Sequence, residues 1–170
     1  MRSLISPNWM RSLKLLLMGT AFSLSIFGTT ISEVWANSTK QLILQQIQTL
    51  QKSDQRWIEI NLTTQRLIAW EGGKPVHAVI ISSGKQSTPT QIGVFKIQSK
   101  HRFARMQGKN YDISDVPYVM YYEGGYAIHG AFWLRKFGIP ISHGCINVAP
   151  DHAKWLFQWA SLGTPVIINN

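Results

Sequence analysis

Short runs of alternating apolar and polar residues dominate the chain from residue 56 onward, and they restrict its fold more than any other feature. In residues 57–62, the side chains of Ile58, Ile60 and Leu62 fall on one face of a strand. Further strands are expected at residues 66–70, 76–82, 93–98, 118–122, 126–129 and 165–168. Gly72-Gly73 lies between residues 66–70 and 76–82, and Gly124-Gly125 lies between residues 118–122 and 126–129, as in β-hairpins. The sequence therefore predicts a mainly β fold.

Helical periodicity is confined to two segments. Residues 150–160 are predicted to form a helix, because Pro150 suits a first helical position and four apolar residues share one face: Ala153, Leu156, Trp159 and Ala160. The glutamine-rich residues 37–55 are predicted to form a short amphipathic helix or a tether. Residues 100–115 show weak periodicity and many polar side chains, so we expect a long surface loop there.

Residues 1–36 have the composition of a secretory signal peptide. Three basic residues, Arg2, Arg11 and Lys14, precede residues 15–30, which carry no charge, and Ala36 ends a site suited to signal peptidase. Cleavage near Ala36 is therefore predicted. The alternative is an uncleaved signal anchor, the only membrane contact expected, although the apolar run is shorter than the roughly 20 residues that span a bilayer. With either outcome, we expect a secreted or periplasmic protein of the cell envelope.

Length, charge and cysteine content exclude several classes of protein. The 170 residues suit one compact domain. The 17 Lys and Arg residues outnumber the 8 Asp and Glu residues, so anionic envelope material is the expected partner. Nucleic acid is not expected, because export is predicted and no RNP, KH or zinc-finger motif occurs. The single cysteine, Cys145, excludes an internal disulfide framework and a four-cysteine zinc site.

Cys145 stands among residues suited to nucleophilic catalysis. A thiol reacts as its thiolate, and a nearby imidazole can take its proton. His143 would share a strand face with Cys145, and His129 lies opposite if its strand adjoins that of Cys145. Gly144 permits a tight turn, so its N–H and that of Cys145 can point at an oxyanion. The alternatives are an inert buried thiol with ordinary histidines, and a zinc site on Cys145, His129 and His143.

The sequence Ser-His-Gly-Cys-Ile-Asn at residues 142–147, with Ile-His-Gly upstream at residues 128–130, resembles the signature of the L,D-transpeptidase catalytic domain, also called the YkuD domain. The resemblance extends over residues 56–170. It includes the Ser83-Gly84 turn and the segment Thr88-Pro89-Thr90-Gln91-Ile92-Gly93-Val94-Phe95. The resemblance implies a single β-sandwich or barrel-like domain with one or two short helices.

The resemblance also implies the central catalytic roles. Cys145 is expected to be the nucleophile and His129 the general base. The carbonyl of Gly130 would hold the tautomer of the imidazole. His143, Gly144 and Cys145 would supply backbone donors to the oxyanion. No metal ion and no organic cofactor is required.

Several residues are expected to support this reaction. Ser142 and Asn147 would orient the turn that carries the nucleophile, although Asn147 is alternatively a cap of the following helix. Three aromatic residues, Trp133, Tyr118 and Tyr111, are candidates to line the substrate groove, with core packing as the alternative for each.

Together these roles imply a peptidoglycan L,D-transpeptidase. Cys145 would attack the carbonyl of the third stem-peptide residue and release the terminal D-alanine. An acceptor amine would then resolve the acyl-enzyme, forming a cross-link between third positions. Carbapenems are expected to acylate the same thiol. The alternatives are an L,D-carboxypeptidase, which uses water as acceptor, and a non-catalytic envelope-binding module.

Overall fold

The structure, a computed structural model, describes the backbone of residues 31–170 and the side chains from residue 37 onward. Most of the predicted signal peptide therefore lies outside the described residues. The elements follow in this order: α1 (Ile31–Gln51), β1 (Arg56–Asn61), β2 (Arg66–Glu71), β3 (Lys74–Ile80), β4 (Gly93–Lys96), β5 (Ser99–Gly108), β6 (Tyr111–Glu123), β7 (Tyr126–Gly130), β8 (Ile146–Val148), α2 (Pro150–Trp159) and β9 (Pro165–Asn169). The mainly β prediction is confirmed.

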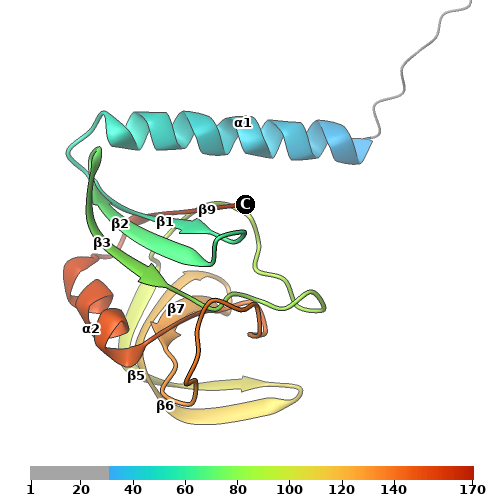
Figure 1. The fold of residues 1–170 in the computed structure, drawn as a ribbon, viewed down its shortest axis with the longest axis vertical. Coiled ribbons are helices and arrows are strands. Elements are labelled where there is room, and N and C mark those ends of the chain that lie inside the picture. Colours follow the sequence, from blue (N-terminus) through green and yellow to red (C-terminus); the bar gives the residue numbers. More distant parts are fainter. Residues whose placement is uncertain (1–30) are drawn as a thin grey trace, which may run out of the picture.

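The strands form two mixed sheets. The five-stranded sheet has the order β3-β2-β1-β9-β4, and the four-stranded sheet has the order β5-β6-β7-β8. Most neighbours are antiparallel, but β1 pairs with β9, and β7 with β8, in parallel. Helix α1 lies along the side of the five-stranded sheet that faces away from the four-stranded sheet, and α2 lies at one end of both sheets (Figure 1). An apolar helix of membrane-spanning length is not found among residues 31–170.

The main core lies between the two sheets and α2, and a second, smaller core lies between the five-stranded sheet and α1. The alternation of side chains in β1 contributes to both cores. Ile58 and Ile60 are fully buried in the main core, as predicted. Trp57 points to the opposite face, where it stacks on Trp70 with ring centroids 5.4 Å apart. Successive side chains of a strand point to opposite faces, so one strand can pack against both the main core and α1.

Helix α1 packs on the outer face of the five-stranded sheet rather than acting as a loose tether. Its side chains Ile43 and Leu50 are buried against Trp57 and Ile167. The helix alternative for the glutamine-rich segment is thus correct, but the bounds differ: the helix begins at Ile31, within the predicted signal peptide, and ends at Gln51 instead of residue 55. Burial of this apolar stripe makes α1 part of the folded unit.

The expected surface loop at residues 100–115 is wrong, because this segment forms most of a β-hairpin. Strands β5 and β6 pair antiparallel from Ser99 opposite Tyr121 to Gly108 opposite Tyr111. Most side chains of β5 are exposed or partly exposed, and only Met106 is buried. Such a strand is held by its hydrogen-bond ladder rather than by a buried face, so it lacks the apolar alternation on which the prediction relied.

Helix α2 agrees with its prediction. Pro150 lies in its first turn, and Ala153, Leu156 and Trp159 are its buried residues. The alternative of Asn147 as a helix cap is wrong: the N-cap residue is Ala149, which makes no side-chain capping bond, and Asn147 lies inside β8.

Candidate active site

Cys145 and His129 lie in one cavity of about 250 Å³. The walls of this cavity come from β5, β6, β7, β8 and the segment between β7 and β8. The lining residues are Met106, Tyr111, Ile113, His129, Trp133, Leu134, Ile141, Ser142, His143, Cys145 and Asn147. Five of the predicted catalytic residues are therefore brought together: Cys145, His129, His143, Ser142 and Asn147.

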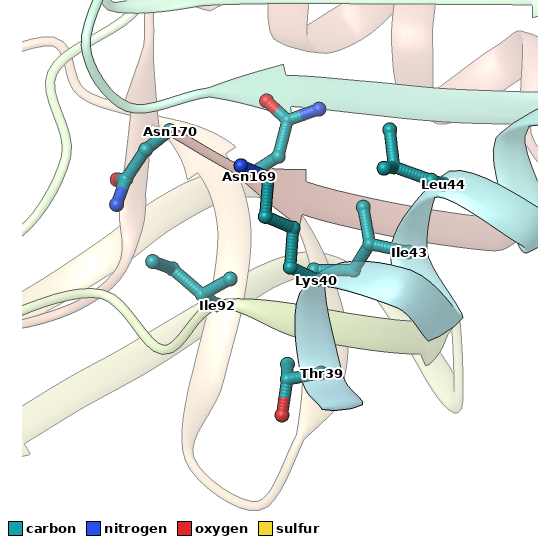
Figure 2. A pocket seen from close by; sticks show the side chains of 7 residues that line it. All are labelled: Thr39, Lys40, Ile43, Leu44, Ile92, Asn169 and Asn170. Atoms are coloured by element: carbon teal, nitrogen blue, oxygen red, sulfur yellow. The ribbon is translucent and has the colours of Figure 1, made fainter. Parts of the chain in front are cut away.

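A larger cavity of about 580 Å³ lies elsewhere, between α1 and the end of β9 (Figure 2). Its walls carry the apolar side chains of Ile43, Leu44 and Ile92, two asparagines, Thr39 and Lys40. We place the candidate active site in the smaller cavity, because both the Cys145 thiol and the His129 imidazole line it.

Parallel pairing of β7 with β8 brings the nucleophile beside the base. His129 in β7 is in register with Asn147 in β8, two residues after Cys145. The expectation that the two strands adjoin is confirmed. The expectation that His143 and Cys145 share a strand face is wrong, because residues 143–145 form a bend and β8 begins at Ile146.

His129 is held as a neutral base. Its side chain is 2 % exposed, and its Nδ1 lies 3.2 Å from the carbonyl oxygen of Gly130. A carbonyl only accepts hydrogen bonds, so Nδ1 carries the ring proton and Nε2 is an acceptor. Burial lowers the pKa of His129 to about 4, and the bond to Gly130 opposes this shift in part. The imidazole is therefore uncharged near neutral pH.

Cys145 is a neutral thiol in the resting protein. Burial raises the pKa of the thiol, although a hydrogen bond from the backbone of Ala127 counteracts the effect. The sulfur also lies 3.8 Å from the carbonyl oxygen of Gly125, to which it donates. A neutral thiol and a neutral imidazole in one cavity suit general-base chemistry, in which the imidazole takes the thiol proton as the sulfur attacks.

The bend before β8 is fixed by the hydroxyl of Ser142. This hydroxyl donates to the carbonyl oxygen of Cys145 at 2.6 Å and accepts the N–H of Gly144 at 3.0 Å. Gly144 has a φ of +115°, and a Cβ there would lie 2.4 Å from Cε1 of Tyr126. The bend therefore requires glycine at this position.

The expected oxyanion donors need one correction. Since the Gly144 N–H is bonded to Ser142 and buried, it is not available to an oxyanion. Within the described residues, the N–H groups of His143 and Cys145 meet no hydrogen-bond acceptor. These two N–H groups are therefore the donors of the bend that an oxyanion could use.

The aromatic predictions divide. Trp133 and Tyr111 line the cavity. The ring centroids of Trp133 and His129 are 5.8 Å apart, and those of Tyr111 and His143 are 4.8 Å apart. Tyr118 does not, so its assignment to the substrate groove is wrong. Its side chain packs on the main core against Phe157 of α2, with ring centroids 5.8 Å apart.

Four lining residues were not anticipated from the sequence: Met106, Ile113, Leu134 and Ile141. Met106 and Ile113 come from the β5–β6 hairpin, where the sequence predicts a loop. Isolated apolar residues in polar surroundings were the available signal for them. The zinc alternative is not supported, because no three His, Cys, Asp or Glu side chains between residues 37 and 170 lie close enough to hold a metal ion.

Comparison with known proteins supports the assignment of this site. The model of the L,D-transpeptidase catalytic domain (YkuD) family matches residues 55–168. L,D-transpeptidase 1 of Mycobacterium tuberculosis is 34% identical over 106 residues, which cover 55% of this chain and 42% of that protein. The chain thus spans less than half the length of this curated relative.

Two solved structures show the same fold. The catalytic domain of the Enterococcus faecium L,D-transpeptidase is 35% identical with a TM-score of 0.62, covering 68% of this chain and 97% of that one. An L,D-transpeptidase solved in complex with imipenem is 26% identical with a TM-score of 0.63, covering 68% of this chain and 59% of that one. On the family match, the fold and the motif at Cys145, the chain belongs to the L,D-transpeptidase catalytic domain family.

Proposed function

We propose that this protein is a peptidoglycan L,D-transpeptidase that uses Cys145 as its nucleophile. The observation that carries the proposal is the placement of Cys145 and His129 in one cavity, with Nδ1 of His129 bonded to the Gly130 carbonyl. This bond leaves Nε2 as the acceptor for the thiol proton.

In the acylation half-reaction, the sulfur of Cys145 attacks the carbonyl carbon of the third stem-peptide residue while Nε2 of His129 takes the thiol proton. The N–H groups of His143 and Cys145 stabilise the resulting oxyanion. The imidazolium then donates its proton to the departing amine of the terminal D-alanine. The products are a thioester on Cys145 and free D-alanine.

In the second half-reaction, an acceptor amine attacks the thioester. His129 takes a proton from the amine and returns it to the sulfur as the thiolate leaves. A new amide between two stem peptides forms, and the free thiol is restored. Water in place of the amine gives an L,D-carboxypeptidase instead. Trp133 and Tyr111, which line the cavity, are proposed to contact the substrate.

Residues 1–36 are proposed to be a signal peptide that exports the domain to the cell envelope, with an uncleaved anchor as the alternative. The apolar run at residues 15–30 and the preceding basic residues support this proposal. Peptidoglycan lies outside the cytoplasmic membrane, so an enzyme acting on its stem peptides must be exported. The full chain carries a net charge of +9, and residues 37–170 retain 14 Lys and Arg residues against 7 Asp and Glu residues, an excess that favours contact with this anionic polymer.

Digestion of purified sacculi, followed by mass spectrometry of the muropeptides, tests the proposal. We expect cross-links between third positions with the wild type and none with Cys145→Ala. Tripeptides without cross-links would identify the carboxypeptidase. Intact-mass analysis after meropenem treatment gives a second readout: an adduct on the wild type that Cys145→Ala lacks. A folded wild type that forms no adduct and leaves sacculi unchanged would contradict both enzymes and favour a non-catalytic envelope-binding module.

A further inference from the structure

The loop between β3 and β4 reaches across to the bend that carries Cys145. Thr90 lies in this loop and is 5 % exposed. Its Oγ1 accepts the N–H of Gly84 at 2.9 Å and donates to the carbonyl oxygen of Gly144 at 2.8 Å. Since the hydroxyl has a single proton, the bond from Gly84 leaves that proton directed at Gly144.

The bond to Gly144 fixes the direction of a different group, the N–H of Cys145. The two residues share one peptide unit, and no peptide bond among the described residues is cis. In a planar trans peptide, the C=O and the following N–H point in opposite directions. With its carbonyl oxygen anchored on Thr90, this peptide aims the Cys145 N–H away from the loop, where it meets no acceptor within the described residues.

Close backbone contact makes this arrangement rigid. A Cβ on Gly84 would lie 2.9 Å from the Cα of Gly144 and 2.3 Å from the carbonyl oxygen of Thr88. In the same loop, the carbonyl oxygen of Ser83 accepts the N–H of Ser142 at 2.9 Å. The loop and the bend are therefore in direct contact, and a small shift of either would rotate the Gly144–Cys145 peptide.

We propose that Thr90 is a positioning residue for the oxyanion donor: by holding the Gly144 carbonyl, it aims the Cys145 N–H at the carbonyl oxygen under attack. Thr90 is not among the residues that line the cavity, so it would act through the Gly144–Cys145 peptide and not by contact with substrate. This inference rests on the proposed acyl transfer at Cys145. Loss of a single oxyanion donor costs roughly 100- to 1,000-fold in rate, so a donor that is present but misdirected is expected to cost less.

The test measures acylation of Cys145 by meropenem in three variants of the full chain. Thr90→Val removes the hydroxyl at nearly constant shape. Thr90→Ser keeps the hydroxyl. Thr164→Val is the matched control, because Thr164 is also a buried threonine, 6 % exposed, whose Oγ1 accepts one backbone N–H, that of Ser161 at 3.0 Å. Urea denaturation measures the stability of each variant.

For Thr90→Val we expect the acylation rate at saturating meropenem to fall about 10- to 100-fold, with the half-saturating concentration within about threefold of the wild type. Thr90→Ser should react at close to the wild-type acylation rate. Thr164→Val should be less stable than the wild type but should keep the wild-type acylation rate. If Thr90→Val does not fold, Thr90→Ala takes its place with the same expectation. A wild-type acylation rate in a folded variant that lacks the Thr90 hydroxyl would overturn this inference and leave the proposed function unaffected.

Infrared spectroscopy of the acyl-enzyme gives a readout that lost stability does not change. Hydrogen bonds to the thioester carbonyl lower its stretching frequency, so the wild-type band is expected below that of Thr90→Val. Equal frequencies would overturn the inference. A wild type that meropenem does not acylate would instead overturn the proposed function, and the inference with it.

Discussion

Nδ1 of His129 lies 3.2 Å from the carbonyl oxygen of Gly130, the residue that follows it in β7. A neighbouring backbone oxygen thus does the work that a carboxylate does in many nucleophile–base pairs. A carbonyl fixes the tautomer without adding a negative charge, so its hydrogen bond offsets only part of the effect of burial, and the imidazole stays neutral.

This environment predicts an unusual pH dependence of acylation. The proposed reaction needs a neutral His129, and burial lowers the pKa of His129 to about 4 from 6.5. The acylation rate should therefore stay constant as the pH falls from 7 to about 5, and decline only as it approaches 4. Stopped-flow measurement of meropenem acylation across this range checks the expectation. An acid limb centred near 6.5 would contradict it.

Substitution of Gly144 should damage both stability and catalysis. In Gly144→Ala, the new methyl group would meet Tyr126, and the φ of +115° would strain the backbone. We expect a loss of about 1–3 kcal/mol in the free energy of unfolding and roughly 100-fold in acylation rate, because the adjoining Cys145 N–H is displaced. Gly163→Ala is the control. Gly163 also has a positive φ, +83°, but no atom lies within 4 Å of the added Cβ. That variant should lose stability and keep its acylation rate; equal catalytic loss would count against the explanation.

The two aromatic residues of the cavity should contribute to substrate binding, unlike the one in the core. Trp133→Ala or Tyr111→Ala is expected to raise the half-saturating concentration of a tetrapeptide donor about 10-fold. Tyr118→Phe should leave it unchanged, because Tyr118 packs against Phe157. Steady-state kinetics of D-alanine release provide the comparison. A larger effect of Tyr118→Phe than of Trp133→Ala would place the substrate elsewhere.

Helix α1 should stabilise the domain without taking part in the reaction. Leu50 is 2 % exposed and packs with Trp57 and Ile167, so Leu50→Ala is expected to cost about 2–4 kcal/mol of unfolding free energy. Leu42→Ala is the control, because Leu42 is 62 % exposed on the same helix; its unfolding free energy is expected to change by less than about 0.5 kcal/mol. Urea denaturation distinguishes the two. Equal stability of both variants would mean that α1 is only a tether.

The sequence predicted those parts of the molecule whose signals are local. Alternation around Ile58 indicated β1, Pro150 indicated the start of α2, and the motif around Cys145 indicated the nucleophile. The hairpin at residues 99–123 was only partly predicted, because most of β5 lacks a buried face and so carries no alternation. Tyr118 was misplaced since proximity in sequence to the motif does not determine which side of a strand a residue faces.

Relationships between distant segments were beyond the reach of sequence patterns. Thr90 and Gly144 are 54 residues apart, and their hydrogen bond depends on how the loop after β3 packs against the bend before β8. This bond follows from tertiary packing, which no local pattern encodes. The bond from the Gly144 N–H to the Ser142 hydroxyl, by contrast, joins residues only two positions apart.

The position of β9 between β1 and β4 has a consequence for biosynthesis. Of the strands in the five-stranded sheet, β9 is the last to be synthesised, yet β4 pairs with no other strand of that sheet. A nascent chain that has not yet exposed residues 165–169 leaves β1 and β4 with open edges, and open edges invite aggregation. Completion of the five-stranded sheet must therefore wait until residues 165–169 have emerged.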